Sequence, residues 1–154
     1  MRVRPGLGLA ERPPVEPEPA RGLVTGGEVL TRAAAAVIRA ALARRTSLRR
    51  RIADLARDLY TLDLARLNVA MAWLGYQWFW SGEDHDRAQA MIDDTLRHVR
   101  ALVEDAAPAK LTPARVETLS LRVMTGYVIG LRRLRYGRAT LDEAVAIVVE
   151  HTLD

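Results

Sequence analysis

Apolar residues recur every three or four positions along most of this chain, which is the spacing of amphipathic helices. In residues 82–106 they form one wide stripe on a single helix face. The pattern predicts an all-α fold, an orthogonal or antiparallel bundle of about six helices. The predicted helices cover residues 28–44, 48–60, 64–80, 82–106, 113–136 and 140 onward.

Residues that cap helix ends support these boundaries. Four of the predicted helices are preceded by a polar side chain that can accept a hydrogen bond from a free backbone amide. These residues are Thr46 or Ser47 for the second helix, Asp63 for the third, Thr112 for the fifth and Thr140 for the last. Thr140 is followed three positions later by Glu143, which makes a capping box. Gly137 is a natural C-cap for the fifth helix.

The first 26 residues differ from the rest of the chain. Five prolines and several glycines interrupt any helix there, and few apolar groups are available to bury. We therefore expect residues 1–26 to form a disordered leader and residues 27–154 to form one helical domain. The sequence predicts neither a secretory signal nor a membrane-spanning helix, so a cytoplasmic location is expected.

The fifth predicted helix is apolar on two sides, so it is either central or shared with another subunit. It also contains Gly126 and Gly130, which lie on one face and let another helix approach closely. Each glycine costs a helix about 1 kcal/mol relative to alanine. Two such glycines indicate close contact with a partner helix or a ligand, or a tight crossing within the chain.

The aromatic residues are concentrated between positions 73 and 80. Successive helical side chains point about 100° apart, so these residues cannot all face one core. One interpretation is a pocket for an apolar or aromatic molecule, with Gln77 or Asn68 as a polar contact. The other is an aromatic core with a tryptophan at its rim. The aromatic residues of this segment are Trp73, Tyr76, Trp78, Phe79 and Trp80.

Chemistry-bearing motifs are sparse. The chain has no cysteine, no Ser/His/Asp arrangement and no phosphate-binding glycine loop, so we expect no enzymatic activity and no cofactor. Asp94 and His98 are one helical turn apart, but a surface pair is favoured over a metal site, and no metal is expected. The net charge is +4, carried almost wholly by arginine, which leaves nucleic-acid binding as an alternative.

From about residue 48 onward the chain resembles the C-terminal, ligand-binding and dimerisation half of TetR-family transcriptional regulators. The resemblance is carried by an aromatic helix, residues 71–80, a short acidic break, residues 81–84, and a long amphipathic helix ending at residue 106. A Gly-x-x-x-Gly-Leu-Arg segment, residues 126–132, and a short last helix beginning at Thr140 follow. The family's N-terminal helix-turn-helix is not found in this sequence.

The resemblance implies a homodimer and an apolar pocket. The implied pocket residues, with the polar candidates above, are Asn68, Trp73, Tyr76, Gln77, Trp80, Met91 and Met124. The implied dimer interface contains Val123, Tyr127, Gly130, Leu134, Val145 and Val148. The expected function is a TetR-like regulatory domain that senses a small apolar or aromatic molecule, with DNA as a partner only if a reader domain is supplied upstream or by another protein. The alternatives are a structural or protein-interaction domain without a ligand, and a basic nucleic-acid-binding protein.

Overall fold

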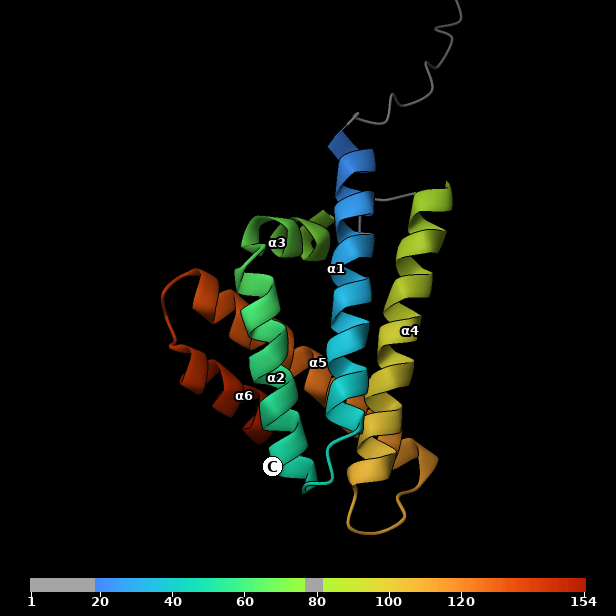
Figure 1. The fold of residues 1–154 in the computed structure, drawn as a ribbon, viewed down its shortest axis with the longest axis vertical. Coiled ribbons are helices and arrows are strands. Elements are labelled where there is room, and N and C mark those ends of the chain that lie inside the picture. Colours follow the sequence, from blue (N-terminus) through green and yellow to red (C-terminus); the bar gives the residue numbers. More distant parts are fainter. Residues whose placement is uncertain (1–18, 77–81) are drawn as a thin grey trace, which may run out of the picture.

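The computed structural model describes residues 19–76 and 82–154, which form six helices and no strand. The predicted all-α class is therefore confirmed (Figure 1). In this part of the chain, no helix has the length and apolar character required to cross a membrane. The helices are α1 (Pro19–Leu42), α2 (Leu48–Leu64), α3 (Leu67–Tyr76), α4 (Gly82–Ala106), α5 (Pro113–Arg135) and α6 (Leu141–Leu153).

The helices surround one apolar core. In Figure 1, α1 and α4 lie side by side and run in the same direction, while α2 runs the opposite way and α3 crosses above its end. Helices α5 and α6 form an antiparallel hairpin that packs behind and beside the other helices. Each helix that packs on this core presents an apolar stripe to it. The largest fully buried side chains include Tyr60, Ile38, Ile52, Leu55, Leu102, Leu131 and Val148.

Three of the predicted helix starts are confirmed. The side chains of Ser47, Thr112 and Thr140 each accept a hydrogen bond from the backbone amide three residues later. The Glu143 carboxylate accepts from the Thr140 backbone amide in return, which completes the predicted capping box. Gly137 follows α5 with φ of 62°, a conformation that glycine adopts without a steric penalty.

The predicted start of the first helix was wrong. Helix α1 begins at Pro19, inside the range expected to be a leader, rather than near residue 28. A proline fits the first turn of a helix, where its missing amide hydrogen is not needed. The glycine at position 26 also has a packing role, because a Cβ there would lie 3.2 Å from Cγ1 of Val69 in α3. Gly26, one of the glycines expected to interrupt a helix, therefore allows α3 to pack closely against α1.

The boundary between the second and third helices was also wrong. Asp63 was expected to cap the third helix, but it lies within α2, which continues to Leu64. Its side chain is buried and accepts a hydrogen bond from the Tyr127 hydroxyl. A tertiary contact with α5 therefore determines the environment of Asp63, which the local cap pattern could not indicate.

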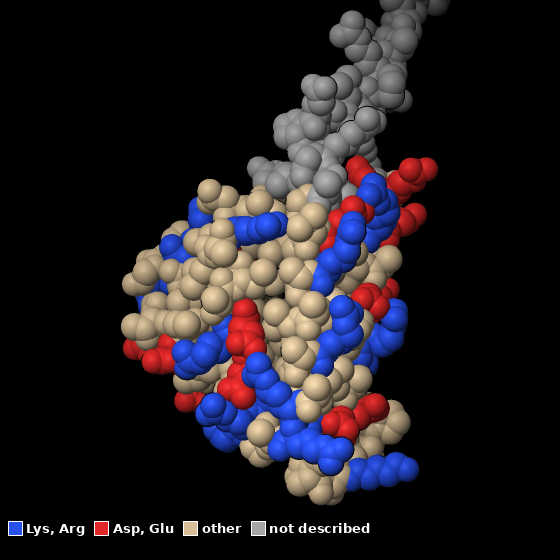
Figure 2. Space-filling model, in the orientation of Figure 1, with Lys and Arg blue, Asp and Glu red and all other residues tan. Residues whose placement is uncertain are grey.

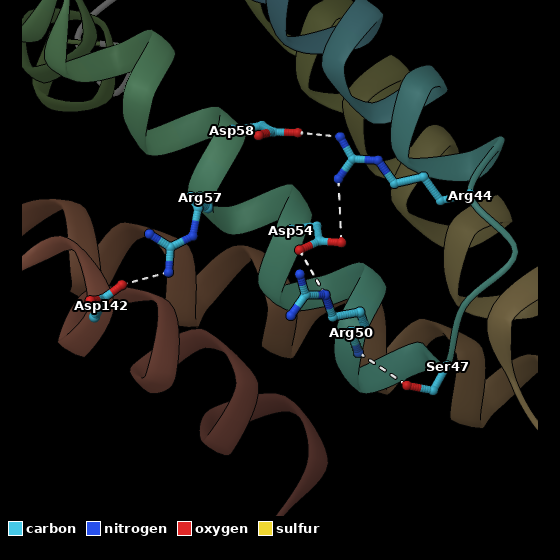
Figure 3. A network of polar contacts seen from close by, with 7 residues as sticks. All are labelled: Arg44, Ser47, Arg50, Asp54, Arg57, Asp58 and Asp142. Carbon is cyan, nitrogen blue, oxygen red and sulfur yellow. Dashed lines mark hydrogen bonds and ion pairs between the residues drawn. The ribbon is translucent and has the colours of Figure 1, made fainter.

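Ion pairs join α2 to the elements on both sides of it (Figure 3). Arg44, which follows α1, contacts Asp54 at 3.4 Å and Asp58 at 2.8 Å. On the other side of α2, Arg57 contacts Asp142 of α6 at 2.5 Å. Most of these side chains are partly exposed, so each pair adds at most about 1 kcal/mol to stability.

Candidate functional site

A pocket-like cavity of about 220 Å³ lies between the helices of the bundle and is partly open to solvent. Helices α1, α2, α4 and α5 form most of its wall, and α3 and α6 contribute one residue each. Its lining residues are Leu30, Thr31, Ala34, Ile38, Ile52, Leu55, Ala56, Leu59, Asp63, Ala70, Met91, Ile92, Thr95, Val99, Val123, Met124, Tyr127, Val128 and Val148.

Small side chains explain why the core is hollow at this place. Ala34, Ala56 and Ala70 come from three different helices and each presents only a methyl group to the cavity. Met91 and Met124 complete the wall from α4 and α5, and both are only partly buried. Methionine is unbranched and polarisable, so it adapts its shape to different occupants. The alanines therefore leave space in the wall, and the two methionine side chains can change conformation to fit different ligands.

One part of the wall is polar. Asp63 is only 7% exposed, and its Oδ2 accepts a hydrogen bond from the Tyr127 hydroxyl. The Thr95 hydroxyl is already used, because it donates to the Met91 carbonyl at 2.9 Å. Within the described part of the chain, no arginine, lysine or histidine forms an ion pair with Asp63. Among the described residues, the buried Asp63 carboxyl group thus has no positively charged partner.

Burial changes the acid–base properties of this polar group. It raises the pKa of Asp63, and the hydrogen bond from Tyr127 offsets only part of that effect. The pKa of Tyr127 is raised as well, first by burial and then by the neighbouring Asp63 carboxylate. Tyr60 stacks on Tyr127 with ring centroids 4.7 Å apart, and its hydroxyl donates to the Tyr127 carbonyl at 3.0 Å. These contacts hold the Tyr127 hydroxyl against Asp63.

The structure brings together some of the residues expected in a pocket and not others. Met91 and Met124 both line the cavity. Asn68 is exposed, accepts a hydrogen bond from Arg135 at 3.4 Å and does not line this cavity. The remaining predicted pocket residues cannot be placed in this way. The side chains of Trp73 and Tyr76 lie outside the described part of the structure, and Gln77 and Trp80 lie outside it entirely.

The two glycines of α5 face the chain's own helices. A Cβ at Gly126 would lie 3.1 Å from the Val148 Cα and 3.3 Å from the His151 Cβ, both in α6. A Cβ at Gly130 would overlap the Tyr60 hydroxyl and lie 2.9 Å from its Cζ. Of the alternatives left open by the sequence, the tight crossing within the chain accounts for both glycines.

Most of the expected dimer-interface residues are buried within the single chain. Val123 and Val148 line the cavity, and Gly130 and Val145 are covered by other helices. Tyr127 and Leu134 are half-buried, with Tyr127 turned toward Asp63. A residue that is buried in the chain's own core cannot contact a second copy, so assigning these four buried residues to a dimer face was wrong. The residues expected there were Val123, Tyr127, Gly130, Leu134, Val145 and Val148.

Sequence reasoning missed most of the cavity wall, including Asp63. A signal for Asp63 was present, since Ile52, Ala56, Leu59 and Asp63 follow the three-to-four-residue period of one helix face. Extending the second helix past Tyr60 places the carboxyl group on the buried stripe. Because the cap pattern predicted that the second helix ends at Tyr60, Asp63 was not recognised as part of its buried face.

Part of the positive charge that left nucleic-acid binding open is engaged in ion pairs. Basic and acidic side chains lie next to one another on the face seen in Figure 2. In particular, Arg44 and Arg50 pair with aspartates, and the buried Arg51 contacts Asp105 at 2.5 Å. Among the described residues, no three acidic or histidine side chains come close enough to hold a metal ion.

Comparison of the chain with protein-family models, with curated protein sequences and with solved structures finds no match.

Proposed function

We propose that this chain is a small-molecule-binding domain that senses an apolar or aromatic compound, as the ligand-binding half of TetR-type regulators does. The observation that carries the proposal is the largely apolar cavity of about 220 Å³ that is lined mainly by α1, α2, α4 and α5. An apolar cavity with a few polar groups is the usual form of a ligand site in a helical domain.

The size of the cavity supports an aromatic occupant. An apolar cavity of about 150 Å³ in another protein stays dry and takes up benzene. A cavity of about 220 Å³ has room for a substituted benzene.

Propylbenzene is a suitable probe because it is apolar and of this size. We expect it to shift the amide resonances of residues on the cavity wall, such as Thr95 and Val123, in a ¹⁵N–¹H NMR titration. It is also expected to raise the midpoint of thermal unfolding with increasing concentration, because it binds the folded chain alone.

Two alanines on α1 provide a matched pair of variants. Ala34 lines the cavity and Ala36 is exposed on the same helix. We expect Ala34→Leu to fill the cavity and abolish the propylbenzene shifts, while Ala36→Leu leaves them unchanged. Equal binding by both variants, or no binding by the wild-type chain, would count against the proposal and favour a structural domain without a ligand.

We also propose that the chain forms a homodimer, with a surface different from the one first expected. Helix α5 and its C-cap Tyr136 present apolar side chains to solvent. These are Leu121, Val128, Ile129 and Tyr136, each at least 38% exposed. A second copy pairing the same side chains would cover them, in keeping with the resemblance that motivates the dimer. Sedimentation equilibrium tests this proposal. Ile129→Glu is expected to give a monomer, whereas Leu64→Glu, at an equally exposed apolar residue outside this set, is expected to leave the dimer intact.

A further inference from the structure

We propose that the preferred ligand of the cavity carries a protonated amine, which pairs with the Asp63 carboxylate while its apolar part fills the remaining space. This inference rests on the proposed function, since it names the class of molecule that the same cavity takes up.

The first argument is the position of the carboxyl group. Asp63 belongs to the cavity wall, yet more than nine-tenths of its surface is buried. Aspartate is almost never buried to this degree without a partner of opposite charge. Its neighbours in the wall, such as Leu59, Ala70 and Val128, offer no charge. The charged form of a carboxyl group in such surroundings is disfavoured, and a positively charged ligand group would stabilise it.

The second argument is the contrast with other aspartates of the same helix. Asp54 and Asp58 are more exposed than Asp63, and both pair with Arg44. Asp63 receives one hydrogen bond, from the neutral hydroxyl of Tyr127 to its Oδ2. No described residue donates a hydrogen bond to the second oxygen, Oδ1, which remains an acceptor. Of these three aspartates of α2, Asp63 is the one for which the described residues provide no positively charged partner.

The third argument is that the wall beside Asp63 favours a cation over a neutral donor. The ring of Tyr127 lines the cavity, and an aromatic ring attracts a positive charge. Hydrogen bonds between an ammonium and a carboxylate are roughly twice as strong as those between neutral groups. Burial raises the pKa of Asp63, and a cation opposite the carboxyl group would stabilise its charged form again. An arylalkyl amine satisfies the apolar and the charged part of the site together.

Three probes of the same shape separate the contributions. Phenethylamine, 2-phenylethanol and propylbenzene differ only in ending with an ammonium, a hydroxyl or a methyl group. We expect phenethylamine to bind the wild-type chain at least about tenfold more tightly than 2-phenylethanol, by the advantage of a charge-assisted hydrogen bond. Calorimetry or NMR titration at neutral pH measures all three affinities. This comparison needs no variant and so does not depend on how a substitution affects folding.

A pair of variants locates the effect at Asp63. In Asp63→Asn we expect phenethylamine binding to fall by at least about tenfold while propylbenzene binding changes by less than about twofold. Asp58→Asn is the matched control, because Asp58 lies on the same helix outside the cavity wall. It is expected to leave all three affinities as in the wild-type chain.

The outcomes separate this inference from the proposed function. If propylbenzene binds but phenethylamine binds no better than 2-phenylethanol, the amine inference is overturned and the apolar cavity remains a ligand site. If phenethylamine loses affinity equally in Asp63→Asn and Asp58→Asn, the attraction is a general surface effect and the inference is again overturned. If none of the three probes binds, the proposed function fails as well.

Discussion

The crossing of α2 and α5 depends on the absence of a side chain at Gly130, and Gly130→Ala tests this directly. A Cβ at this position would overlap the Tyr60 hydroxyl, lie 2.9 Å from its Cζ and lie 3.1 Å from the Ala144 carbonyl oxygen. Tyr60 is fully buried, so its ring has no empty space into which it can move. The added methyl group must therefore push α2 or α6 away from α5.

The magnitude follows from three contributions. Overpacking of a core by one methyl group costs about 1–3 kcal/mol. Displacement of Tyr60 also weakens the hydrogen bond from its hydroxyl to the Tyr127 carbonyl, which is 3.0 Å long and worth about 1 kcal/mol. Alanine is better than glycine in a helix by about 1 kcal/mol, which opposes both losses. We expect a net loss of about 1–3 kcal/mol in the free energy of unfolding.

Urea denaturation followed by far-ultraviolet circular dichroism measures this free energy. Gly75→Ala in α3 is the matched control, because a Cβ there meets no atom within 4 Å. It is expected to stabilise the chain by up to about 1 kcal/mol. Adding Tyr60→Phe to Gly130→Ala removes the overlapping hydroxyl and is expected to recover part of the lost stability. A Gly130→Ala variant as stable as Gly75→Ala would refute the close crossing.

Three further predictions follow from the polar groups. Arg51→Ala is expected to lower the free energy of unfolding by about 2–3 kcal/mol in urea denaturation, because Arg51 is 5% exposed and contacts Asp105. Arg50 is exposed, so Arg50→Ala is the control and is expected to change this free energy by about 0.5 kcal/mol or less. Thr140→Ala removes the N-cap of α6 and is expected to cost about 1 kcal/mol by the same measurement; no change would mean that the cap adds nothing. The folded-state pKa of Asp63 is raised above its ordinary 3.8, so its protonated form favours folding and that contribution is lost as the pH rises above this value. Asp63→Asn is therefore expected to gain stability relative to the wild-type chain between acidic and neutral pH, and a pH-independent difference would contradict a raised pKa.

Features of the fold that depend on neighbouring residues could be predicted from the sequence. The capping box at Thr140 needs only Glu143 three positions later, and the start of α5 needs only Thr112 and the proline after it. The period of the apolar residues likewise indicates which face of each helix is buried. These signals act within one or two helical turns, so no knowledge of the other helices is required.

Features set by contacts between distant residues could not be predicted in this way. Gly130 has the same sequence signature whether it faces a second subunit or Tyr60, which is far from it along the chain. The cavity depends on how Ala34, Ala56 and Ala70 are placed relative to one another, and they come from three helices. Met91 and Met124 were assigned to a pocket through a resemblance, whereas no local pattern indicates that they share one wall.

The cavity and Asp63 are both departures from what a core optimised for stability would contain. A larger apolar residue in place of Ala56 would fill the cavity and make packing contacts that are now missing. Asn or Leu in place of Asp63 would remove the free-energy cost of burying a charge. Natural sequences are expected to break such rules chiefly at functional sites, where the loss of stability is offset by function. Here both departures occur in one wall, where the Tyr127 hydroxyl also holds the carboxyl group in place. Two unrelated packing defects would have no reason to coincide, whereas a site for a molecule with one apolar and one charged end requires both together.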